Sequence, residues 1–143
     1  MAGVAIAGLI AGCAAWFEPK PTTPVVDLTA NVPHELTVEQ AADAALRQVA
    51  RQARDLPDEV GEVVAPQVLK VTLLRPNEHY KAQDVEFFQP EVMWAVDWQG
   101  TVYDCSLSRD CAVFDGGTFM VQDSSGDILD SSFQQRRDGG GGI

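Results

Sequence analysis

Residues 92–98 read Val-Met-Trp-Ala-Val-Asp-Trp, and this stretch decides the fold that the sequence predicts. Successive side chains of a β-strand point to opposite faces of its sheet, so the alternation separates two sets of residues. Both tryptophans share one face with the two valines, whereas the methionine, alanine and aspartate share the other. This period of two is typical of a half-buried strand.

Other segments rich in β-forming residues lie on both sides of this strand. They are Gln67–Leu74, Val85–Phe88, Thr101–Cys105, Thr118–Gln122 and Ile128–Leu129. We expect Gln99-Gly100 to form a two-residue turn, so that residues 92–98 and 101–105 pair as a hairpin. We expect residues 123–126 to form the turn of a second hairpin, and residues 110–117 to form a loop.

The segment before these strands predicts a helix from about Thr37 to Asp55. Thr37 and Gln40 have the spacing of a capping box, in which each side chain accepts a hydrogen bond from the backbone of the other. Small apolar residues, mostly alanines, recur on one side at helical spacing, and Pro57 ends the element. We therefore expect an α+β domain over residues 36–133, with one N-terminal helix packed on a small antiparallel sheet of about four to five strands.

The first residues indicate export. Residues 1–12 are uncharged and apolar, too few for a membrane-spanning helix of roughly 20 residues but enough for the core of a signal peptide. Residues 9–13, Leu-Ile-Ala-Gly-Cys, resemble the lipobox of bacterial lipoproteins. This resemblance implies that residues 1–12 are removed and that Cys13 carries a diacylglycerol, which anchors the domain to the cell membrane on the periplasmic or exterior side.

The missing positive charge at the start of this segment is explained if translation begins upstream of Met1. The alternative is an ordinary apolar N-terminus of a cytoplasmic protein. Residues 13–35 contain interleaved prolines and threonines, which are typical of an extended tether. The polar, glycine-rich residues 134–143 are expected to be a disordered tail.

The cysteine count agrees with export. An odd number of cysteines in a secreted protein normally leaves one thiol to explain, and lipidation accounts for Cys13. Cys105 and Cys111 are then expected to form a disulfide, because disulfides persist outside the cytoplasm. A zinc site would need four ligands, and only His34 and His79 remain as nitrogen donors, so we expect no metal and no cofactor.

The charge excludes one class of partner. The formal net charge is −11 and the pI is about 4.3, whereas nucleic acid requires clustered Lys and Arg. A strongly acidic surface also keeps an exported domain soluble, so the charge by itself demands no particular ligand.

Two segments carry a resemblance to a known family. Residues 36–45, Leu-Thr-Val-Glu-Gln-Ala-Ala-Asp-Ala-Ala, and 121–129, Val-Gln-Asp-Ser-Ser-Gly-Asp-Ile-Leu, resemble the helix start and the closing strand-turn-strand of PepSY domains. The likeness extends over roughly residues 36–133. It implies a small helix-and-sheet module of bacterial exported proteins and protease propeptides, which modulates peptidases or binds a partner at the cell envelope. It brings no catalytic residues.

Four large apolar residues are candidates for partner binding: Phe87, Met93, Trp94 and Trp98. Aromatic residues at this spacing are more often core. One helix covers only one face of a sheet, however, so we expect Phe87 or Met93 to be exposed.

The functional prediction is an exported, lipid-anchored binding or modulatory module without catalytic activity. No nucleophile elbow, phosphate loop or zinc-protease helix occurs in the sequence. Its partners would be the membrane, through Cys13, and an unidentified envelope protein. Two alternatives stay open at this point: a structural accessory lipoprotein of an envelope complex, and an enzyme whose signature is not recognised.

Overall fold

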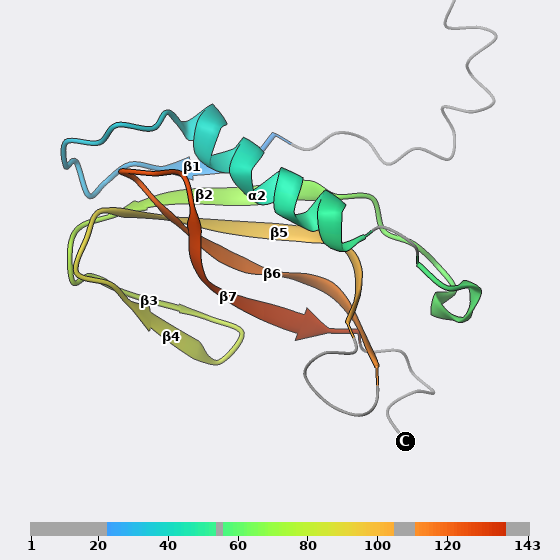
Figure 1. The fold of residues 1–143 in the computed structure, drawn as a ribbon. Coiled ribbons are helices and arrows are strands. Elements are labelled where there is room, and N and C mark those ends of the chain that lie inside the picture. The colour runs from blue at the N-terminus through green and yellow to red at the C-terminus, as the bar shows by residue number, and fades with distance from the viewer. Residues whose placement is uncertain (1–22, 54–55, 105–110, 137–143) are drawn as a thin grey trace, which may run out of the picture.

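A computed structural model describes residues 23–53, 56–104 and 111–136, which form one layered α+β fold (Figure 1). A five-stranded sheet has the order β1-β2-β5-β6-β7, and a separate two-stranded hairpin is formed by β3 and β4. The elements are β1 (Val25–Asp27), α2 (Val38–Gln52), a 3-10 turn η1 (Asp58–Val60), β2 (Gln67–Leu74), β3 (His79–Ala82), β4 (Val85–Phe88), β5 (Met93–Asp104), β6 (Ala112–Gln122) and β7 (Ile128–Gln135).

The central strand β5 pairs antiparallel with β2 on one side and with β6 on the other. Its alternation is confirmed. Trp94, Val96 and Trp98 lie in a core beneath α2, whereas Met93 and Ala95 lie in a second core on the opposite face. The predicted α+β class is also confirmed, with one helix and a mostly antiparallel sheet.

The second core is covered by the β3–β4 hairpin, which lies across the face of the sheet opposite α2 (Figure 1). Gln83 and Asp84 form its tip, and both have positive φ angles of 49° and 64°. Such a left-handed pair matches the twist of a tight hairpin. Phe87 points inward from β4 and is buried against the sheet. The strand β4 was predicted correctly, whereas β3 was not predicted.

The predicted turn at Gln99-Gly100 is wrong, because β5 continues through both residues to Asp104. The pairing with β6 shifts register between Gln99 and Val102, which is the mark of a bulge. Gly100 has φ +154° and packs so tightly that an added Cβ would lie 3.1 Å from both Pro66 Cα and Val49 Cγ1. The glycine therefore marks a close approach of two segments within a long strand.

The partner of this long strand is β6, so the loop expected at residues 110–117 is wrong from Ala112 onward. Gly116 and Gly117 pair with Gln99 and Trp98 in the middle of the sheet. Glycine is depleted in strands generally, and this propensity favoured a loop. Here the absence of a side chain leaves room for Trp98.

The helix α2 forms as the capping residues predict. Thr37 is the N-cap, and both reciprocal hydrogen bonds of the capping box with Gln40 are present. The buried side of α2 consists of Ala41, Ala45 and Val49, whose small size lets the helix axis approach the sheet closely. The helix is nevertheless not the first element of the fold, because β1 precedes it.

The strand β1 corrects both the position of the helix and the extent of the tether. Val25 and Asp27 pair with Lys70 and Thr72 of β2 in parallel, so the sheet is mixed. Ala30 is buried in the core beneath α2. Residues 25–35 therefore belong to the domain, and what remains of the predicted tether lies mostly outside the described residues. The β-branched pair Val25-Val26 lies in a proline-rich segment and is too short to be recognised as a strand from the sequence.

The C-terminal ribbon also extends beyond its prediction. The turn at residues 123–126 is confirmed, but β7 runs to Gln135 instead of ending near Leu129. Arg136 continues the pairing, because its N–H donates to the Val113 carbonyl at 2.9 Å. The predicted disordered tail is wrong for residues 134–136, and residues 137–143 lie outside the described part of the chain.

The close packing at Gly117 yields a stability prediction. A Cβ at this position would lie 2.2 Å from Ser132 O and 2.9 Å from Trp98 Cζ2. Because one obstacle is backbone, we expect Gly117→Ala to lower the free energy of unfolding by about 3 kcal/mol. Chemical denaturation measures this loss. Gly126→Ala is the matched control: its Cβ would meet nothing within 4 Å, and only the left-handed backbone, at φ +79°, costs about 1 kcal/mol. Equal losses in both variants would contradict the packing described for Gly117.

Candidate functional site

The four predicted partner-binding residues are all buried. Trp94 and Trp98 lie in the core beneath α2, whereas Met93 and Phe87 lie in the second core, between the sheet and the β3–β4 hairpin to which Phe87 belongs. None of the four exposes more than 1 % of its surface. The expectation that Phe87 or Met93 is exposed is therefore wrong, because a hairpin of the same chain covers the face that α2 leaves open. In this fold none of the four side chains reaches a partner.

The predicted modification sites lie largely outside the described residues. Cys13 and Cys105 both fall there, so the lipid anchor and the identity of the disulfide partner stay predictions. Cys111 is disulfide-bonded. The last pair of the β5–β6 ribbon, Asp104 with Ala112, brings together the strands that lead to positions 105 and 111. This register supports the predicted pairing.

Asp123, at the turn between β6 and β7, is a carboxylate that accepts three hydrogen bonds. Its Oδ2 accepts the Glu35 N–H at 2.7 Å, and its Oδ1 accepts the Leu36 N–H at 2.9 Å. The same Oδ1 accepts the indole N–H of Trp94, also at 2.9 Å. The side chain of Asp123 thus joins the segment before α2 to the central strand and to the β6–β7 turn.

These contacts decide the charge of Asp123. Burial alone would raise the pKa of the carboxyl, but the hydrogen bonds from Leu36, Trp94 and Glu35 outweigh burial, with help from nearby His34. The result is a pKa below the ordinary value of 3.8. Three donors fix an ionised carboxylate here, so its role in the described fold is to hold backbone segments together.

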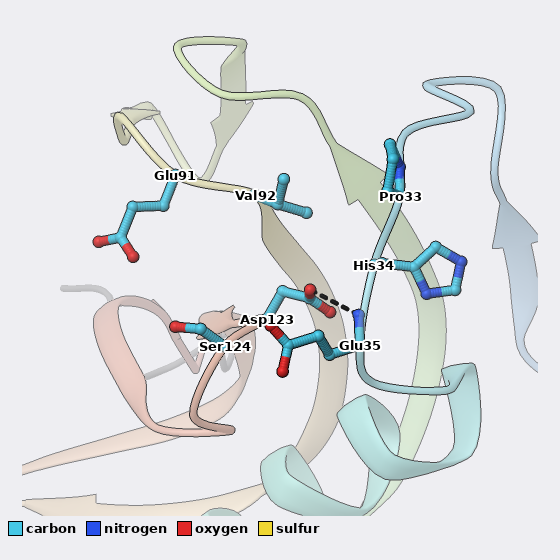
Figure 2. Close-up of a pocket in the computed structure, with 7 residues that line it drawn as sticks. All are labelled: Pro33, His34, Glu35, Glu91, Val92, Asp123 and Ser124. Atoms are coloured by element: carbon cyan, nitrogen blue, oxygen red, sulfur yellow. Dashed lines mark hydrogen bonds between the residues drawn. The ribbon is translucent and has the colours of Figure 1, made fainter.

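A groove of about 320 Å³ lies beside this carboxylate (Figure 2). Seven residues line it: Pro33, His34, Glu35, Glu91, Val92, Asp123 and Ser124. His34 contacts Trp94 edge-to-face, with ring centroids 5.1 Å apart, and its Nδ1 lies 2.8 Å from the Leu36 carbonyl oxygen. Glu91 accepts a hydrogen bond from the Gln122 amide. The polar groups around this groove are thus largely engaged with the chain itself.

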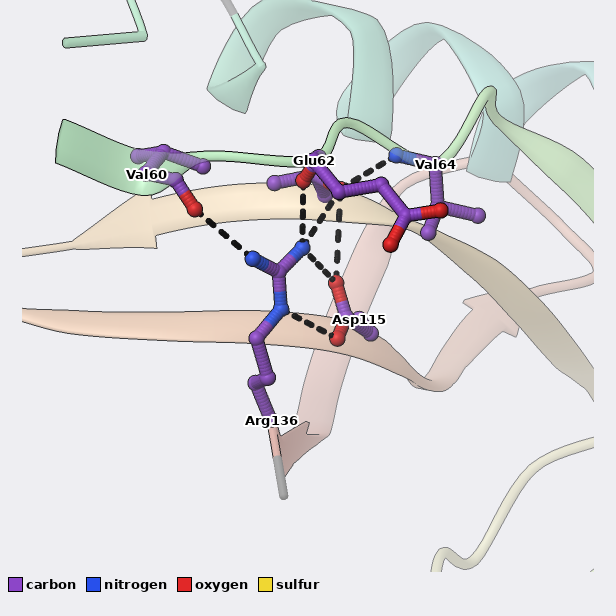
Figure 3. Close-up of polar contacts among 6 residues, drawn as sticks. Val60, Glu62, Val64, Asp115 and Arg136 are labelled. Atoms are coloured by element: carbon purple, nitrogen blue, oxygen red, sulfur yellow. Dashed lines mark hydrogen bonds and ion pairs between the residues drawn. The ribbon is translucent and has the colours of Figure 1, made fainter. Parts of the chain in front are cut away.

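A second polar cluster surrounds Arg136 at the opposite end of the sheet (Figure 3). Its guanidinium binds Asp115 through two contacts, Nε to Oδ2 at 2.7 Å and Nη2 to Oδ1 at 2.8 Å. It also donates to the carbonyl oxygens of Val60 and Glu62, at 2.8 and 2.7 Å. Arg136 therefore fastens the linker that follows α2 to the ends of β6 and β7.

Thr101 of β5 also belongs to this cluster. Its hydroxyl accepts the Val64 N–H at 2.6 Å, and its N–H donates to the Val64 carbonyl at 3.0 Å. The side chain is fully buried. The linker is thus held to β5 by Thr101 and to β6–β7 by Arg136, which makes the cluster a structural clasp.

A third polar group holds the β3–β4 hairpin in place. Tyr80 donates its hydroxyl to Asp97 Oδ2 at 2.7 Å, and Thr118 donates to Asp97 Oδ1 at 2.5 Å. Burial, together with the hydrogen bond to Asp97 and its charge, raises the pKa of the Tyr80 phenol. Tyr80 is therefore neutral at physiological pH, and it anchors the hairpin to the central strand.

The terminal strands of the five-stranded sheet present backbone that has no strand neighbour on one side among the described elements. β7 has a strand neighbour only on its β6 side among the described elements. At the other end, β1 covers only Lys70–Thr72 of the eight-residue strand β2. Val25 and Val26 of β1 are 61 % and 46 % exposed. Open strand edges of this kind are the usual templates for strand addition.

The described residues contain no group of three or more His, Cys, Asp or Glu side chains arranged to hold a metal ion. Within the same residues, no helix has the length and apolar character needed to cross a bilayer.

Sequence reasoning missed the residues that form the two structural clusters. Asp123 was interpreted only as part of a turn, and Arg136 as part of a disordered tail. A buried aspartate at a turn has no local signal, because the donors come from residues 87 and 88 positions away. For Arg136 no local signal was available either, because the strand before it was expected to end near Leu129 and instead extends to Gln135.

The hydrogen bonds of Asp123 predict a pH-dependent contribution to stability. Asn keeps one acceptor oxygen but loses the other, so Asp123→Asn should lower the free energy of unfolding by about 2 kcal/mol at neutral pH. The lowered pKa means that the wild-type advantage is fully present above pH 3.8 and is lost as the pH falls through the folded-state value. Urea denaturation of both proteins between neutral and acidic pH measures the difference.

Asp84→Asn is the control for this experiment. Asp84 is exposed at the hairpin tip, where Asn tolerates the positive φ angle equally well. A wild-type advantage over Asp123→Asn that stayed constant down to strongly acidic pH would contradict the assigned role of the carboxylate.

The clasp around Arg136 predicts a large effect for a residue near the C-terminus. Arg136→Ala removes two hydrogen bonds from Asp115 and one from each of two carbonyl oxygens, and we expect a loss of about 2 to 3 kcal/mol in unfolding free energy. Arg75→Ala is the control, because Arg75 is exposed and lies 3.8 Å from Glu78, a geometry worth at most about 0.5 kcal/mol. Thermal unfolding of the two variants compares them directly. Similar losses would show that the Arg136 contacts do not hold the linker.

Comparison with known proteins adds no relative. No family model matches the chain, and no curated protein or solved structure matches it. The resemblance to PepSY domains therefore stays a prediction from the sequence.

Proposed function

We propose that this chain is an exported, lipid-anchored binding module without catalytic activity, which acts on an envelope peptidase or another surface protein. The observation that carries the proposal is the contrast between the faces and the edges of the sheet. Both faces are covered by elements of the same chain, whereas β7 and most of β2 keep an open edge. Strand addition at such an edge is a recurrent way of binding an extended segment.

The polar interior supports the same proposal. Asp97, Asp115 and Asp123 each accept hydrogen bonds that fasten one segment of the fold to another. Groups employed in this way stabilise a scaffold. The two segments that resemble a PepSY domain form a capped helix and the β6–β7 ribbon, as that family's pattern implies.

Export and anchoring are supported by the cysteines. Cys111 is disulfide-bonded, and disulfides persist mainly outside the cytoplasm. Lipidation of Cys13 would leave the two remaining cysteines to pair with each other. From Cys13 to Val25 there are 25 − 13 = 12 steps along the chain, which span at most about 40 Å when extended. The proposed anchor would thus hold the domain close to the membrane.

Cross-linking in intact cells tests this proposal. A tagged wild-type chain and its Cys13→Ala variant are cross-linked, and the attached proteins are identified by mass spectrometry. We expect a specific envelope protein to be recovered with the wild type and to be strongly reduced with the variant, because the anchor delivers the module to its target. Mass measurement of the mature N-terminal peptide shows directly whether Cys13 carries the lipid.

The outcomes separate the two halves of the proposal. Equal recovery of the same protein from both chains would contradict the role of the anchor. Specific recovery from neither chain would contradict the binding role, and would favour a catalytic or small-molecule function.

A further inference from the structure

We propose that the groove between α2 and β7 binds an extended, acidic segment of a partner protein, which adds to the open edge of β7. This inference rests on the proposed binding function and names the surface and the chemistry of the partner. The groove has a volume of about 360 Å³. Its lining comes from two sides, namely Ala44, Arg47, Gln48 and Arg51 of α2, and Gly126, Asp127 and Ile128 of the β6–β7 ribbon.

The position of α2 creates this groove. The helix packs mainly over β2, β5 and β6, so it leaves the outer margin of the sheet uncovered near the start of β7 (Figure 1). A peptide between a helix and a sheet edge makes main-chain hydrogen bonds to the edge, while its alternate side chains point toward the helix. The groove lies at the start of β7, where Ile128 is the residue of that strand among its lining, so a segment paired with β7 would bring one end to α2.

The strand β7 is suited to such pairing. Its eight residues contain a single ionisable side chain, Asp130, although the whole chain carries 21 acidic residues. Lys and Pro, which commonly block pairing at exposed edges, are absent from β7. The register shift between Met120 and Val121 leaves Leu129 as a bulged residue, and a second shift lies between Phe114 and Gly116, so the pairing of β7 is regular from Asp130 to Gln134.

The charge of the groove selects the partner. Arg47 and Arg51 lie one helical turn apart on its wall, in a protein whose net charge is −11. Asp127 is the one carboxylate among the lining residues, and Asp43 pairs with Arg47 at 3.2 Å, so Arg51 is the cation on the groove wall that is placed to pair with a ligand carboxylate. Charge complementarity therefore favours a Glu or Asp side chain, and it disfavours a second copy of this acidic chain.

Both arginines are available to a ligand. Arg47 pairs with Asp43 at 3.2 Å, but the two side chains are 68 % and 60 % exposed, and such surface pairs contribute little. Arg51 donates to Gln48 at 2.5 Å on the same exposed side of α2. Neither contact buries the guanidinium, so a carboxylate entering the groove can replace or extend it.

Binding of designed peptides to the full chain tests the proposal. The probes are acetylated, amidated peptides of alternating Thr and Val with one Glu near the end, and matched peptides with Gln or Lys in its place. NMR spectra of the labelled protein report which amides respond. We expect the Glu peptide to shift the amides of β7 and the side-chain N–H signals of Arg47 and Arg51, and to bind about tenfold more tightly than the Gln peptide.

Charge reversal provides the matched variants. Arg47→Glu combined with Arg51→Glu should weaken binding of the Glu peptide at least about tenfold and should reverse the preference in favour of the Lys peptide. Both positions are exposed on the helix, and Glu is nearly as good a helix former as Arg, so the fold is retained. Arg75→Glu, away from the groove, should leave binding unchanged.

Two results would overturn the proposal. One is the absence of shifts in β7 at millimolar Glu peptide, and the other is binding that neither the Gln substitution nor the double charge reversal weakens. Either result would leave the cross-linking outcome untouched, so a failure of this groove is distinguishable from a failure of the proposed binding function.

Discussion

Burial of β5 on both faces is the constraint on which the rest of this structure depends. Trp94 and Trp98 require a cover on one side, and Met93 and Ala95 require a cover on the other. The chain supplies α2 for the first face and the β3–β4 hairpin for the second. Each cover needs its own attachment, because apolar contact alone is not directional. Asp123 provides the attachment ahead of α2, and the Tyr80–Asp97 hydrogen bond provides it for the hairpin.

Because both faces of the sheet are covered, the four large apolar residues that the sequence suggested for partner binding are not those of the proposed site. Large aromatic residues contribute most when they are buried, and covering both faces leaves Phe87, Trp94 and Trp98 inaccessible. The site proposed here is the margin of the sheet, where main-chain groups would take the place of side chains in recognition. In that proposal, specificity comes from the few side chains beside the edge, among them Arg47 and Arg51.

Local chemistry made part of this fold predictable. The capping box of Thr37 and Gln40 lies within four residues, and the alternation of residues 92–98 reports both faces of β5 directly. The missed elements depend on distant partners. The three residues of β1 form a strand only because β2 offers Lys70–Thr72 beside them. Glycine is typical of turns, so Gly100 was expected in one. It lies instead inside β5, where Pro66 and Val49 leave no room for a side chain. Asp123 and Arg136 owe their roles to donors and acceptors more than 70 positions away. The edges of the sheet follow from the strand order, which no local pattern in the sequence specifies.

The central claim is that the faces of the sheet are closed and the edge of β7 is open. Hydrogen exchange of backbone amides in the intact chain tests it most directly, because an amide exchanges slowly when it is hydrogen-bonded within the stable fold. We predict slow exchange throughout the paired parts of β5 and β6. In β7 we predict an alternation, with slow exchange where the N–H points to β6 and fast exchange where it points outward. Uniform protection along β7 would contradict the account, since it would mean that the edge is already covered, and fast exchange in β5 would mean that the two faces are not closed.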